Sequence, residues 1–108
     1  MIDIVVVLND LNNFVNLLMS ICMQTLSDKV NVYVISGNYD YDFSRELELF
    51  HSRISINVLY KRGTVGVKRQ FGIDNSSGDY ILFLDDNDLL YNSFSLQKLY
   101  ENAINNDI

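Results

Sequence analysis

The fold is decided by the stretch Gly78-Asp79-Tyr80-Ile81-Leu82-Phe83-Leu84-Asp85-Asp86-Asn87-Asp88. Its first half, from Tyr80 to Leu84, shows no alternation of polar and apolar residues, which predicts a strand buried on both faces, as in a parallel sheet. That strand runs directly into four oxygen-bearing side chains, Asp85 to Asp88. Because ligands of open α/β sheets bind beyond the carboxyl ends of the strands, the sequence predicts a binding site here.

The acidic run offers the oxygen donors that a hard divalent cation requires, so Mg²⁺ or Mn²⁺ is the expected metal. A single aspartate in this place would more simply cap a helix or form a turn. Three aspartates and one asparagine in a row favour a site, because uncompensated like charges packed together are unfavourable. A calcium EF-hand loop fits poorly, since Leu89-Leu90-Tyr91 follows in place of a turn glycine and later oxygen ligands.

Length and composition indicate one globular domain. The chain has 108 residues, and its 48% hydrophobic content can build a core. No apolar run approaches the roughly 18 residues that span a membrane, and the N-terminus lacks the basic region of a secretory signal. Cys22 is the only cysteine, which excludes an intramolecular disulfide and a cysteine-based metal site. A cytoplasmic location is the default expectation.

The charge distribution carries more information than the total. A formal net charge of -6 argues against a general nucleic-acid binder. Half of the 8 basic residues nevertheless lie within one short window, namely Lys61, Arg62, Lys68 and Arg69. Together with the carboxylates, such a cluster could hold an anion through direct cations and a bridging metal. A surface patch without a ligand is the equally simple alternative.

Strands and helices are predicted in strict alternation. Apolar, β-branched runs predict strands at residues 3–8, 30–35, 54–60 and 80–84. Helical spacing of apolar residues predicts helices at about 11–23, 43–50, 65–75 and 96–104. This pattern implies an α/β fold of three layers, with a mostly parallel sheet, right-handed crossovers and helices on both faces, as in Rossmann-like domains. The strand ends at Asn9, Ser36 and Asp85 would then share one crevice.

Several familiar phosphate and nucleotide sites are absent. The turn after the first strand, Asn9-Asp10-Leu11-Asn12, lacks the glycines of a dinucleotide fold, and no Gly-Lys-Ser/Thr sequence of a P-loop occurs. A response-regulator receiver would end its third strand in an aspartate, where this chain has Tyr60-Lys61. The 65–75 helix contains Gly66 and Gly72, which weaken it but leave room for a close approach of a neighbouring backbone.

Four sequence blocks, taken in order, carry a family resemblance. Residues 5–25 end in Gln24-Thr25, and Val34-Ile35-Ser36-Gly37-Asn38 stands in the place of a Val-Asp-Asp-Gly-Ser loop. Residues 66–73 look like an Ala-Arg-Asn-x-Gly-Ile helix, and residues 78–88 like Gly-Glu-Tyr-Ile-x-Phe-Leu-Asp-x-Asp-Asp. Together they resemble the N-terminal half of a family 2 glycosyltransferase with the GT-A fold, over essentially the whole chain.

The resemblance implies a donor site for a nucleotide sugar, most often a UDP-sugar, and hexosyl transfer to an acceptor. Asn9 would lie at the nucleotide pocket, together with Ser36. Arg69 would contact the base or the phosphates, with Lys68 beside it.

The acidic loop would complete that donor site. Asp85 and Asp86 would hold the ribose and, through Mg²⁺ or Mn²⁺, the diphosphate. Asp86 and Asp88 are the first choice of metal ligands, with Asp85 and Asn87 as the alternative pair. A metal with nearby cations would neutralise the charge of the departing diphosphate.

Two departures from the family pattern support a second hypothesis. Ser36 and Gly37 stand in the place of the family's acidic pair, and Asn87 stands in the place of one aspartate. Each of the three removes a carboxylate, which fits a GT-A-like interaction domain that has lost donor binding. The second half of the family's domain, which binds the acceptor and supplies the general base, is not represented, so no residue is assigned as that base. The expectation is a truncated domain whose uncovered apolar surface favours self-association or a partner.

Overall fold

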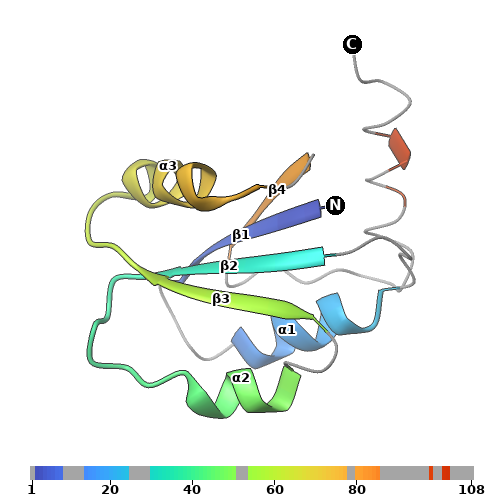
Figure 1. Ribbon diagram of the computed structural model, residues 1–108, viewed down its shortest axis with the longest axis horizontal. Coiled ribbons are helices and arrows are strands. Elements are labelled where there is room, and N and C mark those ends of the chain that lie inside the picture. The colour runs from blue at the N-terminus through green and yellow to red at the C-terminus, as the bar shows by residue number, and fades with distance from the viewer. Residues whose placement is uncertain are drawn as a thin grey trace.

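The computed structural model describes residues 2–8, 14–24, 30–50, 54–77 and 80–85, together with Lys98, Glu101 and Asn102. Strands and helices alternate through these ranges, as Figure 1 shows. They are β1 (Ile2–Leu8), α1 (Phe14–Cys22), β2 (Val30–Ser36), α2 (Ser44–Phe50), β3 (Ser55–Tyr60), α3 (Val65–Asn75) and β4 (Tyr80–Asp85). The predicted helix at 96–104 lies mostly outside the described residues, although Lys98, Glu101 and Asn102 are helical.

The four strands form one parallel sheet in the order β3-β2-β1-β4. Their register is flush at the carboxyl ends. Leu8 of β1 pairs with Ser36 of β2, Ser36 pairs with Tyr60 of β3, and Val7 pairs with Asp85 of β4. The predicted α/β fold with a parallel sheet is confirmed, and the strand ends meet at one edge.

The sheet face toward α1 and α2 holds the main core. Alternate residues of each strand point to this face, because successive side chains of a strand lie on opposite sides. The core residues of β1 are Ile2, Ile4, Val6 and Leu8, and α1 contributes Phe14, Leu17, Leu18 and Ile21. All of them are buried, and each such side chain stabilises the fold by roughly 1.5–3 kcal/mol relative to exposure.

The opposite face of the sheet is covered by α3, which packs on β1 and β2. A Cβ atom at Gly72 would lie 2.5 Å from Cγ1 of Val5, so only glycine allows α3 this close to β1. At Gly66 the nearest atom, Oγ1 of Thr64, would be 3.8 Å away, an ordinary contact. Gly72 therefore lets α3 lie against the Val5 side chain of β1, which is a side-chain contact rather than the expected approach of a backbone, and Gly66 makes neither.

A buried carboxylate joins this face to the turn before β4. Asp3 of β1 is fully buried, and its Oδ1 accepts a hydrogen bond from Nδ2 of Asn31 at 3.2 Å. Its Oδ2 accepts from the main-chain N–H of Ser77 at 2.8 Å. Asp3 thus connects β1, β2 and the segment leading into β4. Within the described ranges, no helix is long and apolar enough to cross a membrane.

Candidate functional site at the carboxyl edge of the sheet

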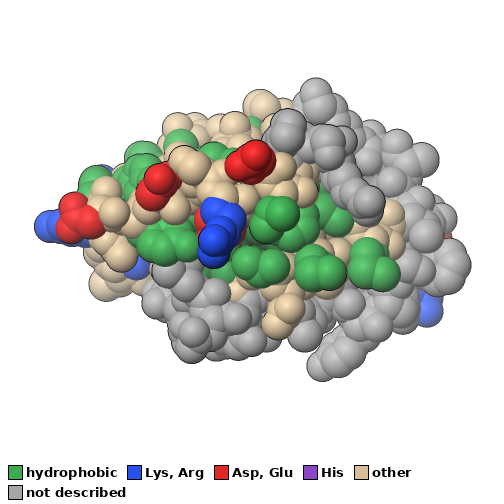
Figure 2. All heavy atoms as spheres, turned by 90° about the horizontal axis from the view of Figure 1, so that it is seen from below, with side chains coloured by type: hydrophobic (Ala, Val, Ile, Leu, Met, Phe, Trp, Pro, Cys, Tyr) green, Lys and Arg blue, Asp and Glu red, His purple; other side chains and the backbone are tan. Residues whose placement is uncertain are grey.

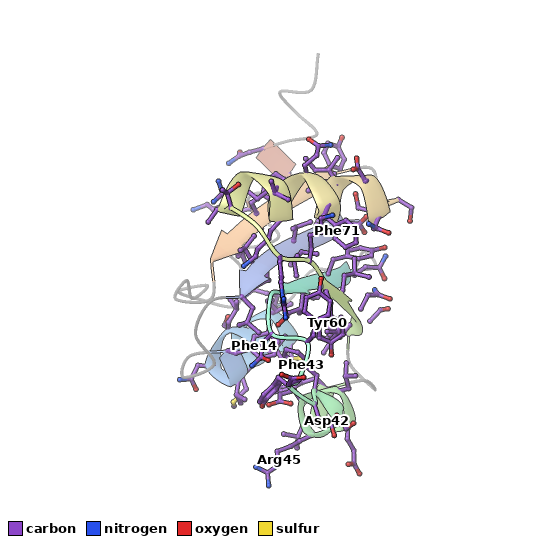
Figure 3. The ribbon with its side chains drawn as sticks, turned by 90° about the vertical axis from the view of Figure 1, so that its left-hand side faces the viewer. Phe14, Asp42, Phe43, Arg45, Tyr60 and Phe71 are labelled. Atoms are coloured by element: carbon purple, nitrogen blue, oxygen red, sulfur yellow. The ribbon has the colours of Figure 1, made fainter. Side chains whose placement is uncertain are left out.

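The candidate site lies where the four strands end. Figure 3 looks onto this edge, with α3 above the sheet and α1 and α2 below it. Leu8, Ser36, Tyr60 and Asp85 are brought together here by the flush register. Asn9 and Asp86 follow Leu8 and Asp85 in the chain, but they lie outside the described residues, as does Asp88. Their predicted roles remain predictions.

The ammonium group of Lys68 lies at the end of β2. Lys68 lies on α3, a helix that begins at an N-cap, Thr64, whose hydroxyl accepts from the main-chain N–H of Val67 at 3.2 Å. A Cβ atom at Gly37 would lie 3.2 Å from Nζ of Lys68. The ammonium group therefore packs against the backbone just beyond Ser36, and the absence of a side chain at Gly37 makes room for it.

Ser36 itself is buried and takes part in the turn that follows β2. Its Oγ accepts a hydrogen bond from the main-chain N–H of Asn38 at 3.1 Å. Its carbonyl oxygen accepts from the N–H of Lys61 at 2.9 Å, so the loop after β3 begins beside the loop after β2. The hydroxyl thereby satisfies a backbone donor, a common turn role of serine.

Arg69, the second predicted cation, points elsewhere. Its guanidinium carbon lies 5.8 Å from the centre of the Phe83 ring on β4. Adjacent helical residues project about 100° apart, because a turn holds 3.6 residues. The Lys68 side chain therefore lies at the end of β2, while the Arg69 side chain extends toward β4. The last residue of β4 is Asp85.

An aromatic and cationic cluster occupies the β3 end of the edge. The sequence indicated its cations, Lys61 and Arg62, but not the aromatic rings that they contact. The rings of Tyr39 and Tyr60 stack with their centres 5.6 Å apart and their planes at 28°. The guanidinium carbon of Arg62 lies 4.8 Å from the centre of the Tyr39 ring. Lys61 Nζ lies 5.5 Å from the centre of the Phe71 ring. We call Tyr39, Tyr60 and Arg62 the stacked cluster.

The loop that carries Tyr39 is anchored on both sides. The hydroxyl of Tyr60 donates to the carbonyl oxygen of Tyr41 at 3.3 Å, and the hydroxyl of Tyr41 donates to Oε1 of Glu46 at 2.6 Å. The hydrogen bond to Glu46, followed by burial, raises the pKa of Tyr41 above 10.0. Among the described residues, Oε2 of Glu46 is buried without a hydrogen-bond partner, and Tyr41 donates the hydrogen bond that the other carboxylate oxygen accepts.

Asp42 lies two residues before the start of α2 and caps its first turn. Its Oδ1 accepts from the main-chain N–H of Ser44 at 2.9 Å and also from the Ser44 hydroxyl. These two hydrogen bonds, the side-chain one first, hold the pKa of Asp42 below 3.8. The loop from Gly37 to Phe43 is therefore ordered by its own polar groups, which fixes the position of Tyr39.

The described residues contain no group of three His, Cys, Asp or Glu side chains that could hold a metal ion. The predicted ligands Asp86 and Asp88 are not among those residues, so this observation does not bear on them.

An apolar pocket of about 370 Å³ lies between the C-terminal ends of α1 and α2. It is lined by Met19, Cys22, Met23, Leu49 and Phe50, at the C-terminal ends of α1 and α2. Figure 2 shows the face formed by these helices, with hydrophobic side chains gathered across it. Cys22 is partly buried and packs against the core. This pocket is remote from the carboxyl edge of the sheet.

The fold is an α/β domain whose parallel strands end at one edge, the place where open sheets of this kind bind their ligands. The family model described as glycosyl transferase family 2 matches residues 4–108, and the chain belongs to that family. The predicted resemblance is confirmed. No curated protein matches the chain.

Solved structures of TarS from S. aureus share the fold. TarS 1-349 has a TM-score of 0.80 at 19% identity, over 97% of this chain and 33% of that one. The same protein in complex with UDP gives 0.77 at 17% identity, over 96% and 32%. Its complex with UDP-GlcNAc gives 0.78 at 16% identity, over 96% and 31%. This chain thus spans about a third of the length of those chains.

Proposed function

We propose that this chain forms the donor-binding part of a glycosyltransferase and holds a nucleotide-diphosphate sugar at the carboxyl edge of the sheet. The observation that carries the proposal is the Lys68 ammonium packed at Gly37, at the end of β2. No carboxylate of the described residues lies within ion-pair distance of Lys68. An anionic ligand would supply the negative charge that balances the Lys68 ammonium group. The presence of UDP and UDP-GlcNAc in the TarS complexes supports the same ligand class.

Charge neutralisation is the chemical task at such a site, because a nucleoside diphosphate departs as the sugar is transferred. Lys68 would stabilise that charge directly from α3. Mg²⁺ or Mn²⁺ would supply further Lewis-acid stabilisation, held by Asp86 and Asp88 just after the last residue of β4. Carboxylate oxygens are suitable donors for either ion. Transfer of a hexosyl group, with the acceptor bound by further polypeptide, completes the proposal.

Calorimetry tests the donor site directly. UDP, GDP and several nucleotide sugars are titrated into the chain with and without Mn²⁺. We expect binding that requires or is strengthened by the metal. Lys68→Ala should weaken it by about tenfold, the effect of losing one charge-assisted hydrogen bond of roughly 1.5 kcal/mol. Lys98→Ala is the matched control, because Lys98 is an exposed lysine in a separate helical segment. The absence of binding by every nucleotide would refute the proposal.

The second candidate is a non-catalytic GT-A-like interaction domain. This candidate is favoured by Ser36, which stands where the family carries a carboxylate. The Ser36 hydroxyl accepts a hydrogen bond within the turn after β2. Asp86→Ala and Asp88→Ala discriminate between the two functions. A donor site loses metal and nucleotide affinity in these variants with little change in the free energy of unfolding. An interaction domain shows no nucleotide-binding difference between the variants and the native chain.

A further inference from the structure

We propose that Met19, Cys22 and Met23 form a binding site for a soft monovalent metal ion, Cu⁺, in the apolar pocket between the C-terminal ends of α1 and α2. This site is separate from the carboxyl edge of the sheet. It does not depend on the function proposed for that edge.

Sulfur is concentrated in this one part of the chain. The 108 residues include 1 cysteine and 3 methionines, and the cysteine and two of the methionines lie within residues 19–23. All three of these side chains line the same pocket, together with Leu49 and Phe50. A single cysteine excludes a site made of cysteines alone, but two thioethers can complete a ligand set around one thiolate.

The last turn of α1 brings the three side chains together. The main-chain N–H of Met23 donates to the carbonyl oxygen of Met19 at 3.1 Å, so these two residues are one helical turn apart. Side chains three and four positions apart on a helix have Cβ atoms roughly 5–6 Å from each other. The side-chain amide of Gln24 donates to the carbonyl oxygen of Ser20 at 2.9 Å, which fixes the end of this turn. The flexible methionine side chains can then turn their sulfurs toward a shared ion.

The chemistry of the pocket selects the ion. Thiolate and thioether sulfurs are soft ligands that favour Cu⁺, whereas Mg²⁺ and Ca²⁺ need oxygen donors, which the side chains lining this pocket lack. Cys22 would release its thiol proton to solvent on binding the ion. One thiolate and one Cu⁺ carry no net charge together, so the complex can lie against Leu49 and Phe50 without the cost of an unpaired charge. A divalent ion would leave a net positive charge on this apolar surface.

The position at the end of α1 favours a cation and gives it access. Met19 is 48% exposed and Met23 is 66% exposed, while Cys22 is partly buried, so an ion can reach the sulfurs from solvent. The C-terminal end of a helix carries a partial negative charge. Because α1 has no basic residue in its last turn, that charge is not offset within the helix. A cation bound to the three sulfurs would offset it.

Transfer of Cu⁺ from its coloured complex with bicinchoninate to the whole chain, under nitrogen and with a reductant, tests the site. We expect the native chain to take up a single Cu⁺ per molecule and Cys22→Ala to take up none. Met19→Leu and Met23→Leu nearly conserve the apolar volume and should each weaken binding by about tenfold or more, because even groups that only support a metal ligand contribute about 10–100-fold in affinity. Ser20→Ala is the matched control in the same turn, since the Ser20 hydroxyl donates to the carbonyl oxygen of Leu17. This variant should bind Cu⁺ like the native chain.

Three results would overturn the site. One is the failure of the native chain to take up Cu⁺. Another is uptake that is unchanged when Met19→Leu and Met23→Leu are combined, because Cys22 would then act without the thioethers. The third is an X-ray absorption spectrum at the copper edge that shows nitrogen or oxygen ligands instead of the expected sulfur shell. Circular dichroism shows whether Cys22→Ala keeps its fold, and if it does not, the combined methionine variant decides.

Discussion

Asp3 and Ser77 are joined by a 2.8 Å hydrogen bond, although they are far apart in the chain. The carboxylate is fully buried and also accepts from Asn31, so a single side chain connects three parts of the sheet. A charge in the middle of an apolar sheet is costly unless it is hydrogen-bonded, and these donors meet that requirement.

We expect Asp3→Ala to lower the free energy of unfolding by roughly 3 kcal/mol, because it removes the acceptor of the buried Asn31 amide and of the Ser77 N–H. Urea denaturation of both proteins measures the difference. Asp40→Ala is the control, since Asp40 is exposed and lies in the loop after β2. A loss no larger than that of the control would show that Asp3 does not hold the sheet together.

Gly72 and Gly66 should respond in opposite directions to alanine. Gly72→Ala places a Cβ atom 2.5 Å from Val5, and overpacking of this kind costs about 1–3 kcal/mol. Gly66→Ala meets no such contact and should be neutral or stabilise α3 by up to about 1 kcal/mol. Thermal denaturation of the two variants tests this contrast. Equal effects at both positions would contradict the close approach of α3 to β1.

Tyr41 should make the stability of the fold sensitive to alkaline pH. Its pKa is raised in the folded state, chiefly by the hydrogen bond to Glu46, so the folded chain keeps this proton more tightly than the unfolded chain does. The stabilisation is fully present below pH 10.0 and is lost as the pH rises through the raised folded pKa.

Tyr41→Phe removes this dependence. We expect it to lower the free energy of unfolding at neutral pH by about 1–2 kcal/mol, because Glu46 loses its donor. The difference between the two proteins should narrow above pH 10.0, where the native tyrosine begins to ionise in the unfolded chain. Urea titrations across that range provide the measurement. A difference that stays constant with pH would argue against the raised pKa.

The β4 side of the sheet should promote self-association of the isolated chain. Among the described residues, β4 pairs only with β1, and Ile81 and Phe83 are each 37% exposed on the same face of the strand. An edge strand with exposed apolar residues is a template for pairing. We therefore expect the chain to form dimers or larger species in light scattering.

A charge on that edge should reverse the association. Ile81→Lys is expected to shift the chain toward the monomer, because charged side chains block edge pairing. Ile73→Lys on α3 is the control, since Ile73 is exposed to a similar extent, 39%, but lies on a helix. A native chain that is monomeric and binds no hydrophobic dye would contradict the prediction.

The local sequence pattern was sufficient to predict the strands and helices. It was not sufficient to predict the side-chain contacts between them. The 65–75 helix and the start of β4 at Tyr80 were predicted correctly, because apolar periodicity and turn residues act within a few positions. The partner of Asp3 could not be predicted, since nothing near Asp3 indicates Ser77. That the Lys68 and Arg69 side chains point in different directions could have been predicted from helical geometry alone.

The stacked cluster shows the same limit. Tyr39 and Arg62 come from two loops that meet only after β2 and β3 pair, so neither sequence neighbourhood indicates the other. The one signal was the run of aromatic residues Tyr39, Tyr41 and Phe43 in an otherwise polar loop. In contrast, a close approach at Gly66 or Gly72 was expected, because a glycine inside a helix calls for a packing reason, but the sequence did not indicate which of the two or that Val5 of β1 would be the neighbour.

The position of β1 inside the sheet has a consequence for synthesis of the protein. This strand is made before either of its neighbours, β2 and β4, and Ile2 pairs with both Val30 and Tyr80. A chain that leaves the ribosome from its N-terminus therefore exposes one hydrogen-bonding edge of β1 until β4 emerges. Pairing of segments this distant is slow and leaves apolar strands open to wrong partners. The nascent chain therefore depends on β4 to cover the open edge of β1.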